Sequence, residues 1–238
     1  MLKLNLPTVS ADLKAEFAAD LKINLSDIWT TDSAEQILHC LQRETPYDNA
    51  FFAAGRYQSL LDQELRQMPA EQVRQWMAQL HQLAAEGTGF LYGSHLIGRP
   101  QRQMQTPPLL SQVHQLLNSP AMLQFVRELT GEKELIYVSA QASRYVPGNY
   151  LTRHNDVVEA EGRRFAYVMG FTRQWHPDWG GLLQFFTPDG TPTQTWVPRF
   201  NNMALFEVHH PHAVTYVTPF ARQVRYSITG WFRTKGPQ

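Results

Sequence analysis

The stretch YLTRHNDVVE, residues 150–159, places a histidine and an aspartate two positions apart, at His154 and Asp156. Side chains at positions i and i+2 of a β-strand point to the same face, so both groups could reach one interior point. An imidazole and a carboxylate suit a divalent metal such as Fe(II), and a second histidine would complete a facial triad with open coordination positions. A His-x-Asp tripeptide alone is a weak signal, because it occurs by chance in many proteins.

A second histidine has to come from later in the chain, where LFEVHHPHAVTYV offers His209, His210 and His212. Three histidines within four residues are unusual in a chain that has nine. His212 is followed by a regular strand pattern, with Val214 and Tyr216 in phase with it. We therefore expect His212 to be the third ligand and the other two histidines to lie in a loop beside a proline turn.

A buried cation is predicted near the end of the sequence, in VRYSITGWFR, where Arg225 and Ser227 share one strand face. A guanidinium and a hydroxyl that point into a β core need a buried anion, or the arginine is left uncompensated. A carboxylate that accepts a bidentate guanidinium contact and a hydroxyl hydrogen bond would fit. The alternative is an edge strand that leaves Arg225 in solvent.

The elements that must position these groups change character along the chain. The first half has helical apolar spacing with cap and stop residues, which predicts helices within residues 30–44, 68–87 and 107–131, the last broken at Asn118-Ser119-Pro120. From about Glu134 short runs rich in β-branched and aromatic residues alternate with turn signals. These runs predict strands within residues 134–146, 164–171, 181–187, 193–198, 203–208, 213–220 and 225–232.

Several short strands in about 100 residues indicate a sandwich or barrel. We expect one domain over residues 1–238, in which a mainly helical portion, 1–133, packs on one side of a β core, 134–238, that carries the site.

The composition excludes several classes of protein. Lys+Arg and Asp+Glu are both 21, so there is no global electrostatic footprint for nucleic acid, and we expect no direct nucleic-acid binding. The single cysteine, Cys40, rules out an intramolecular disulfide and fits a small core residue of a helix. No apolar run approaches the ~18 residues that a membrane span needs, and the N-terminus is too polar for a secretory signal. The default expectation is a cytoplasmic protein.

The order of these motifs resembles a known family. His-x-Asp, Gly-Gly-x-Leu, Phe-Glu-Val before His-x-Val, and Arg-x-Ser before Gly-Trp-Phe follow one another between about Ser143 and Arg233. This order is similar to that of Fe(II)- and 2-oxoglutarate-dependent dioxygenases of the prolyl 4-hydroxylase type. Within that family, EGRRFAYVMGF, WGGLLQFF and FNNMALFEVHHPHAV are most similar to the catalytic domain of ribosomal-protein prolyl hydroxylases.

The resemblance implies a mainly β fold with α-helices: a double-stranded β-helix, or jelly roll, with helices on one side. It implies that His154, Asp156 and His212 hold the iron. It further implies Fe(II) as cofactor, 2-oxoglutarate and O2 as co-substrates, succinate and CO2 as co-products, and ascorbate as a candidate reductant. In halogenating relatives a small residue takes the place of the carboxylate, so Asp156 argues for hydroxylation.

The co-substrate residues also follow from the resemblance. Arg225 matches the arginine that pairs with the distal carboxylate of 2-oxoglutarate, with Ser227 as a helper. Tyr145 falls where the family often has a tyrosine that touches the co-substrate, although a core tyrosine on a strand is an equal alternative. Trp231 matches an aromatic residue near the hydroxylation pocket, and a buried structural tryptophan is the simpler interpretation.

The sequence departs from the family pattern at Gly170, where related prolyl hydroxylases have a tyrosine against the co-substrate carboxylate. Either Tyr167 or Tyr145 compensates, or the pocket is roomier. The ribosomal hydroxylases of eukaryotes also carry a second, non-catalytic β-helix domain. Because this sequence stops at Gln238, we expect the docking role of that second domain to be absent.

The substrate implied by the resemblance is a prolyl residue in a protein, with a component of the translation machinery as the candidate partner. One alternative is a hydroxylase of free proline or another small metabolite. Another is a β-helix binding module that has lost catalysis. The intact set of His154, Asp156, His212 and Arg225 argues against the inactive module. Oligomeric state is left open.

Overall fold

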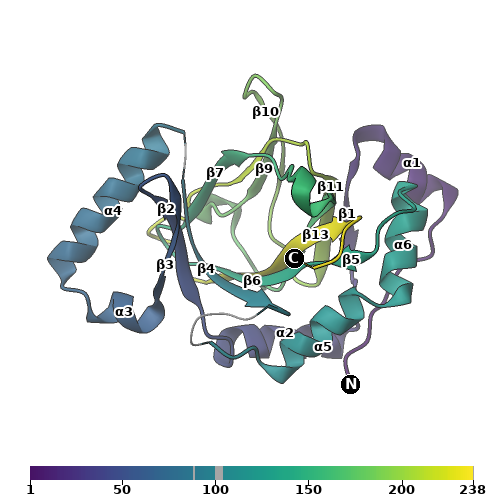
Figure 1. Cartoon of the computed structure of the whole chain (residues 1–238), viewed down its shortest axis with the longest axis horizontal. Coiled ribbons are helices and arrows are strands. Elements are labelled where there is room, and N and C mark those ends of the chain that lie inside the picture. Colours follow the sequence, from purple (N-terminus) through teal and green to yellow (C-terminus); the bar gives the residue numbers. More distant parts are fainter. Residues whose placement is uncertain (88, 100–103, 238) are drawn as a thin grey trace.

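The strands form one antiparallel sheet that curls over on itself. In the computed structural model, which describes residues 1–87, 89–99 and 104–237, thirteen strands belong to this sheet. Its hydrogen-bonded order is β1 (Lys22–Ser26), β11 (Asn202–Glu207), β8 (Arg163–Gly170), β13 (Arg225–Arg233), β6 (Ala140–Tyr145), β4 (Phe90–Ile97), β7 (Tyr150–His154), β12 (His212–Val214), β9 (Leu183–Phe186) and β10 (Pro192–Trp196). The curl produces two facing walls around a central space (Figure 1).

The two walls differ in length. The longer wall runs from β1 to β4, and the shorter one comprises β7, β12, β9 and β10. They are joined where β4 pairs with β7, through Phe90 opposite Leu151 and Leu91 opposite Tyr150. Two facing antiparallel walls are the arrangement of a jelly roll, so the predicted fold is confirmed.

Four helices cover the outer face of the longer wall: α1 (Ala11–Asp20), α2 (Thr31–Arg43), α5 (Pro108–Leu117) and α6 (Pro120–Thr130). Their apolar stripes, which include Ile37, Leu41, Val113 and Val126, pack with strand residues such as Met169 in the largest buried cluster of the described residues. The predicted helices in 30–44 and 107–131 are therefore present, and the break between α5 and α6 falls at Asn118-Ser119. Cys40 lies in this core, as expected.

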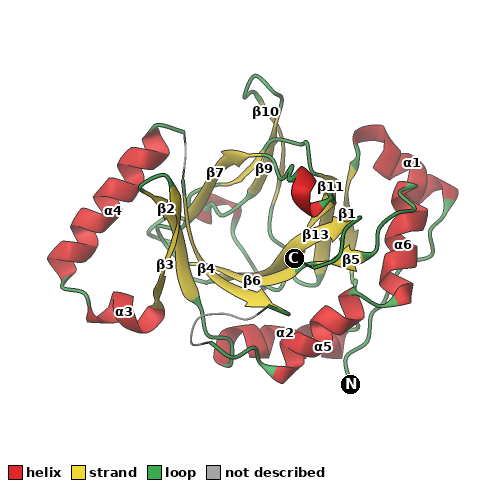
Figure 2. Ribbon diagram, viewed as in Figure 1, coloured by secondary structure: helices red, strands yellow, loops and turns green. Residues whose placement is uncertain are grey.

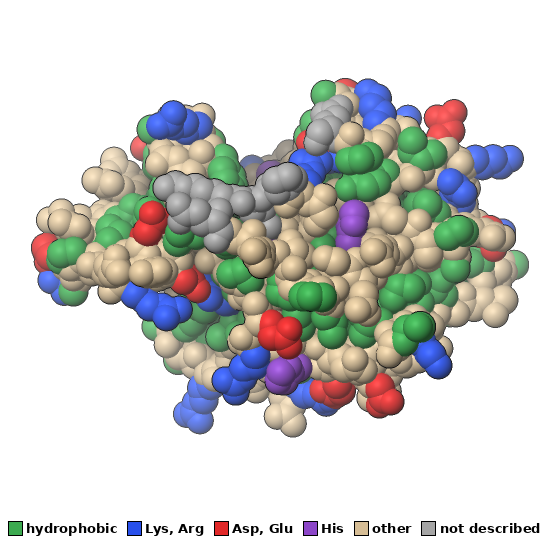
Figure 3. Space-filling model, turned by 60° about the horizontal axis from the view of Figure 1, so that its bottom comes forward, with side chains coloured by type: hydrophobic (Ala, Val, Ile, Leu, Met, Phe, Trp, Pro, Cys, Tyr) green, Lys and Arg blue, Asp and Glu red, His purple; other side chains and the backbone are tan. Residues whose placement is uncertain are grey.

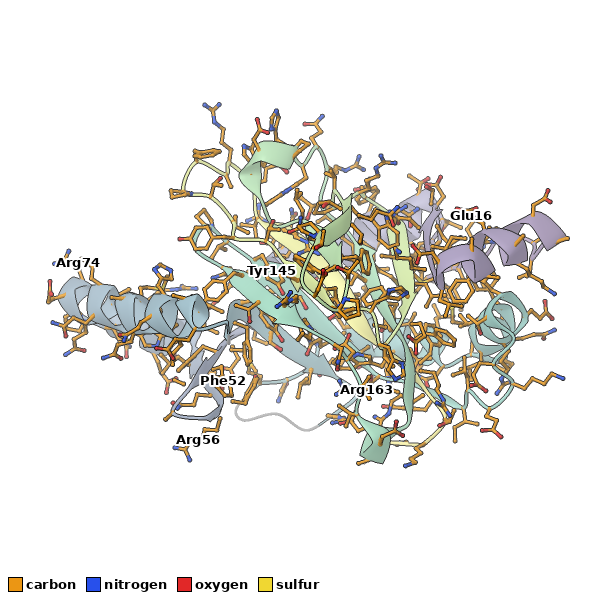
Figure 4. The ribbon with its side chains drawn as sticks, turned by 90° about the horizontal axis from the view of Figure 1, so that it is seen from above. Glu16, Phe52, Arg56, Arg74, Tyr145 and Arg163 are labelled. Atoms are coloured by element: carbon orange, nitrogen blue, oxygen red, sulfur yellow. The ribbon has the colours of Figure 1, made fainter. Side chains whose placement is uncertain are left out.

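Two further helices lie at the opposite end of the molecule from α1 and α6 (Figure 2). These are α3 (Asp62–Gln67) and α4 (Ala70–Ala85), and α4 begins and ends within the predicted range 68–87. Figure 4 shows the separation: Arg74 lies on α4 at one end and Glu16 on α1 at the other, with the strands between them. Helices therefore flank the sheet at both ends, and only one group of them covers the longer wall.

The first half of the chain also contains strands that the sequence patterns did not predict. β1 adds to one edge of the longer wall, β4 joins the two walls, and β2 (Asp48–Ala53) with β3 (Arg56–Leu61) forms a hairpin beside β4. A short strand of the second half, β5 (Tyr137–Val138), lies within the predicted range 134–146 and pairs with β13. Apart from the β2–β3 hairpin contact, the unpredicted strands pair with residues distant in the sequence. Tertiary contacts rather than local preference therefore determine them.

The strand predicted for residues 213–220 is shorter than expected. β12 covers only His212–Val214, and Tyr216 lies beyond its end with 41% of its surface exposed. The chain leaves the strand geometry where the Gly180-Gly181 turn passes close by, with the Gly181 N–H donating to the carbonyl of Thr215. Tyr216, which the sequence pattern placed on the strand in phase with His212, is therefore a loop residue.

The surface agrees with the charge balance of the sequence. On the face shown in Figure 3, Lys and Arg side chains are interspersed with Asp and Glu. Among the described helices, none has the length and apolar character needed to cross a membrane.

Candidate metal and co-substrate site

A β-bulge turns His154 toward the space between the walls. In the pairing of β7 with β12, His154 lies opposite His212 and Leu151 lies opposite Val214, so β7 has one extra residue between these pairs. An extra residue in one strand re-aims the side chains that follow it. Leu151 and His154 both line the central cavity as a result, although an unbroken strand would place them on opposite faces.

Asp156 reaches the same point from beyond the end of the strand. β7 ends at His154, so the expected i, i+2 arrangement on one strand is not how the two side chains converge. The backbone N–H of Asp156 donates to the carbonyl of Val208 at 3.0 Å, which holds the chain against the residue that follows β11. The carboxylate is thereby placed beside His154, and 8% of the residue is exposed.

The three predicted ligands meet. His154 Nε2 lies 3.6 Å from Asp156 Oδ1, and His212 Nε2 lies 3.5 Å from Asp156 Oδ2. One ligand atom from each residue lies within 4.8 Å of the other two. A divalent ion binds histidine nitrogen and carboxylate oxygen at roughly 2.0–2.2 Å, so ligand atoms on one ion are about 3–4 Å apart. The donor set and its spacing therefore fit a divalent metal.

Both histidines present the same ring nitrogen to this point. His154 Nδ1 lies 2.9 Å from the carbonyl oxygen of Thr152, and His212 Nδ1 lies 2.9 Å from that of His210. A carbonyl only accepts, so each Nδ1 carries the proton and donates it. Each Nε2 keeps its lone pair free for a metal, which is the outer-shell support that metal-binding histidines usually have.

The charge states of His212 and Asp156 favour cation binding. Burial lowers the pKa of His212 to about 4, although the Asp156 carboxylate opposes this shift, so its imidazole is neutral at neutral pH. Burial would raise the pKa of Asp156, but hydrogen bonding by His154 and the neighbouring imidazoles outweigh it and lower that pKa. For His154, burial alone would lower the pKa, but the hydrogen bond and the charge of Asp156 outweigh it, so the pKa is raised above its ordinary value. The site combines a buried carboxylate with two imidazoles.

His209 and His210 lie outside this cluster. His209 is exposed and its side chain bonds to Glu207. His210 Nε2 lies 2.9 Å from the carbonyl oxygen of Asp20. The structure thus brings His212, and neither of its two neighbours, to His154 and Asp156.

Arg225 and Ser227 lie on β13 and face the same cavity. β13 pairs with β6 on one side and β8 on the other, so it is an interior strand rather than an edge strand. Arg225 is 3% exposed and Ser227 is fully buried. Within the described residues, Arg225 Nε and Nη1 and the Ser227 hydroxyl have no hydrogen-bond partner. A buried guanidinium without an anion is costly, so this end of the cavity has the character of an anion site.

Tyr145 forms the wall beside that guanidinium. The Arg225 guanidinium carbon lies 5.0 Å from the centre of the Tyr145 ring, and Tyr145 stacks on Tyr92 with ring centres 5.2 Å apart. Figure 4 shows Tyr145 among the strands at the centre of the molecule. Burial raises the pKa of Tyr145, which keeps its hydroxyl protonated. Tyr145 is therefore both a buried strand residue and a cavity residue, and the two sequence interpretations are compatible.

Gly170 has no room for the tyrosine of related enzymes. A Cβ at this position would overlap the backbone carbonyl oxygen of Arg199. Tyr167, one of the two residues considered as a substitute, packs in the core under the helices and donates its hydroxyl to the carbonyl of Ser139 at 3.0 Å. Of the two candidates, Tyr145 is the one whose ring lies beside Arg225.

A single cavity of about 510 Å³ connects the triad with Arg225. Trp231 also lines it, with the Arg163 guanidinium 3.5 Å from its ring centre and an indole N–H that has no partner among the described residues. The sequence patterns missed several other lining residues because they lie on strands of the first half or carry no motif of their own. These are Phe52, Phe90, Tyr92, Gln141, Ser143 and Thr229.

Comparison with known proteins gives a match over the part of the chain that carries the site. Residues 140–233 match the 2OG-Fe(II) oxygenase superfamily. This range includes all six predicted site residues.

Two relatives are about one-third identical to this chain within the segments that align. The prolyl 3,4-dihydroxylase OGFOD1 of Ostreococcus tauri is 32% identical over 142 residues, which is 54% of this chain and 27% of that protein. The prolyl 3-hydroxylase OGFOD1 of Xenopus laevis is 32% identical over 102 residues, which is 40% of this chain and 19% of that protein. The matched stretch thus spans about a quarter or less of these relatives.

Among solved structures, a 2OG-Fe(II) oxygenase family oxidoreductase from Burkholderia pseudomallei has a similar fold. The TM-score is 0.63, with 14% sequence identity over 98% of this chain and 94% of that one. At this identity the similarity concerns the fold alone, and it covers nearly the whole chain.

Proposed function

We propose that this chain, whose residues 140–233 match the 2OG-Fe(II) oxygenase superfamily, is a dioxygenase that hydroxylates a prolyl residue of a polypeptide. The co-substrates are 2-oxoglutarate and O2, and the co-products are succinate and CO2. The observation that carries this proposal is the convergence, in one cavity, of a two-histidine, one-carboxylate triad and a buried arginine that has no anionic partner among the described residues.

The triad fits Fe(II). His154, Asp156 and His212 would hold the ion through two imidazole nitrogens and one carboxylate oxygen, which leaves coordination positions open. When bound, the iron supplies the oxygen chemistry, and the protein supplies binding, orientation and the exclusion of water. The hydrogen bonds from Nδ1 of each histidine keep the rings in the orientation that binding requires.

The other end of the cavity fits the co-substrate. Arg225 Nε and Nη1 can donate to one carboxylate of 2-oxoglutarate, and the Ser227 hydroxyl can donate to the same group. The ring of Tyr145 covers the guanidinium. Binding of a dicarboxylate would satisfy donors that the protein itself leaves unpaired.

Buried apolar side chains of the cavity limit the access of water. Leu183, Phe206 and Val214 line the same cavity as the triad and Arg225. A dry wall strengthens the electrostatic contacts inside it. These residues orient the co-substrate by shape and leave the charged contacts to the triad and Arg225.

The lining favours a prolyl residue within a polypeptide over free proline. Among the described residues that line the cavity, Asp156 is the one carboxylate, and the metal would occupy it. Free proline carries an ammonium group, which would enter this cavity without an anionic partner at a considerable cost. A prolyl residue inside a chain carries no such charge.

The names of the relatives support a protein substrate and also suggest the carbon that is hydroxylated. The proteins of Ostreococcus tauri and Xenopus laevis are named as a prolyl 3,4-dihydroxylase and a prolyl 3-hydroxylase, and position 3 is common to both names. We therefore assign hydroxylation at C3 to this chain. A component of the translation machinery is the candidate partner, and the cytoplasm is the compartment in which such a substrate is met. The single buried cysteine fits a reducing compartment.

The activity is tested in two steps. Anaerobic addition of Fe(II) and 2-oxoglutarate should produce a visible metal-to-ligand absorption band, and O2 should then yield succinate. Failure of both would favour a binding module that has lost catalysis. Peptides and free proline are then screened for a mass gain of one oxygen, and hydrolysis distinguishes 3- from 4-hydroxyproline. Hydroxylation of free proline alone would contradict the polypeptide assignment.

A further inference from the structure

The β2–β3 hairpin and β4 form a sheet with two different faces. One face packs on α4, through Phe51 and Leu91 against Leu80 and Trp76. The side chains of the opposite face alternate with these, because side chains of a strand point in turn to either side. Phe52 and its neighbours on that face line the mouth of the catalytic cavity.

An unbroken row of aromatic rings crosses this second face. Tyr57 lies opposite Phe52 in the hairpin register, and its ring centre is 5.9 Å from that of Phe90. Phe90 lies 6.3 Å from Phe52 and 5.7 Å from Tyr92, and Tyr92 stacks on Tyr145. The row runs from Tyr57, which is 57% exposed, to Tyr145, which is 4% exposed and lies beside Arg225.

The outer rings of this row are not explained by packing. The helix-facing side of the hairpin already buries its apolar residues, and the tip is a two-residue turn of Ala54 and Gly55 with positive φ angles of 51° and 74°. Aromatic residues that are left uncovered beside a cavity mark a surface that binds something. Figure 4 labels Phe52 and Arg56 on this hairpin and Tyr145 on the central strands.

We infer that Phe52, Tyr57, Phe90 and Tyr92 form the substrate subsite of this enzyme and select an uncharged, extended prolyl segment. The inference rests on the proposed function and adds the residues that would give it specificity. The compact apolar pyrrolidine ring packs on aromatic faces, and a proline-containing segment is pre-ordered in an extended form, so little conformational entropy is lost. The four side chains carry no charge, so the rings themselves favour an uncharged segment.

The experiment uses the full chain with Fe(II) and 2-oxoglutarate. The probes are two pools of peptides of about ten residues, randomised except for a central proline in one and a central alanine in the other. Anaerobic capture of peptides, read by mass spectrometry, measures binding without turnover. Hydroxylation in air gives kcat and KM for the best binders.

The variants are Tyr57→Ala, Phe90→Ala and Phe90→Leu, with Phe220→Ala as a matched control. Tyr57 and Phe220 are both exposed aromatic residues, at 57% and 61%, and neither belongs to the cavity lining, but the ring of Tyr57 contacts Phe90 of the row. We expect KM for the peptides to rise roughly 3- to 10-fold for Tyr57→Ala and Phe90→Ala, with kcat nearly unchanged, which is the size of single aromatic contacts. Phe90→Leu keeps the strand apolar, so its KM should rise by less than that of Phe90→Ala.

The outcomes separate the subsite from the function. Enrichment of proline-centred over alanine-centred peptides, reduced by Tyr57→Ala and not by Phe220→Ala, supports the subsite. If the wild-type protein hydroxylates prolyl peptides and both Tyr57→Ala and Phe90→Leu behave like the control, the subsite is wrong and the function stands. If the wild type converts 2-oxoglutarate to succinate and hydroxylates no prolyl peptide, the proposed function itself fails.

Discussion

Two arginines on neighbouring strands illustrate how the two faces of the longer wall differ. Arg144 on β6 and Arg225 on β13 are close in the sheet, since Tyr226 pairs with Arg144 and Arg225 pairs with Tyr145. Arg144 lies outside the cavity lining and binds Asp62, the first residue of α3, with both terminal nitrogens, each at 2.7 Å. Arg225 faces the cavity and has no such carboxylate among the described residues.

The contrast separates a structural cation from a functional one. A paired buried charge is compensated within the chain, whereas an unpaired one is compensated only when a ligand arrives. The histidines divide in the same way, since His209 is exposed and bonds to Glu207, whereas Nε2 of His154 and of His212 faces Asp156 in the cavity. Groups on the cavity face are therefore expected to affect ligand binding, and those on the other face to affect stability.

The largest effect is expected from His212→Ala. Removing one of three metal ligands should weaken Fe(II) binding by more than roughly 100-fold, since even outer-shell changes cost about 10- to 100-fold. Metal content and the anaerobic absorption band with 2-oxoglutarate measure this loss. The matched control is His209→Ala, which should retain most of the metal. If His209→Ala lost the metal and His212→Ala retained it, His209 would be the ligand instead.

Arg225→Ala tests the unpaired cation. The affinity for 2-oxoglutarate should fall by about 2–5 kcal/mol, the usual cost of losing one partner of a buried charge pair, while iron is retained. Stability without ligand should be unchanged or higher, because an uncompensated buried charge is removed. Calorimetric titration with 2-oxoglutarate and urea unfolding measure the two quantities. An unchanged affinity would show that Arg225 does not bind the co-substrate.

Arg144→Ala tests the paired cation and should show the opposite behaviour. We expect a loss of about 1.5–3 kcal/mol in the free energy of unfolding, because Asp62 loses two charged hydrogen bonds. The affinity for 2-oxoglutarate should change little. Arg66→Ala is the control, since Arg66 is exposed and lies 3.7 Å from the same carboxylate, and such surface pairs contribute about 0–1 kcal/mol. An equal loss in the free energy of unfolding for Arg144→Ala and Arg66→Ala would show that the Arg144–Asp62 pair contributes no more than a surface pair.

The smallest effect is the pH dependence of the Arg144–Asp62 pair. Burial would raise the pKa of Asp62, but the bonds and charge of Arg144 outweigh it, so the pKa in the folded protein lies below the ordinary value of 3.8. The stabilisation is therefore complete above that value and is lost as the pH falls through the lower folded pKa. Urea unfolding between about pH 6 and pH 3 should show wild-type stability falling toward that of Asp62→Asn. If the stabilities of the wild type and Asp62→Asn changed in parallel with pH, the lowered pKa of Asp62 would be contradicted.

Much of the β core and of the site could be read from local patterns. Arg225 and Ser227 share a face because strand alternation is independent of context, and the helices at 30–44, 68–87 and 107–131 follow from apolar spacing and cap residues. The strands of the first half were missed, since short segments such as β2 and β4 are defined by partners distant in the sequence. The row of aromatic rings formed by Phe52, Tyr57, Phe90 and Tyr92 was missed for the same reason, because it lies on these strands.

Side-chain chemistry and the phase of each strand are local properties, so the chain itself specifies which donors exist and which of them face inward together. Their meeting is not local. A bulge in β7 turns His154 inward, the contact of Asp156 with Val208 places a carboxylate beyond the end of that strand, and pairing with β12 brings His212 across. Hydrogen bonds between residues far apart in the sequence set this geometry, and they form only when the whole sheet has curled. The same holds for close backbone contacts, such as the one with Arg199 that leaves no space for a side chain at Gly170.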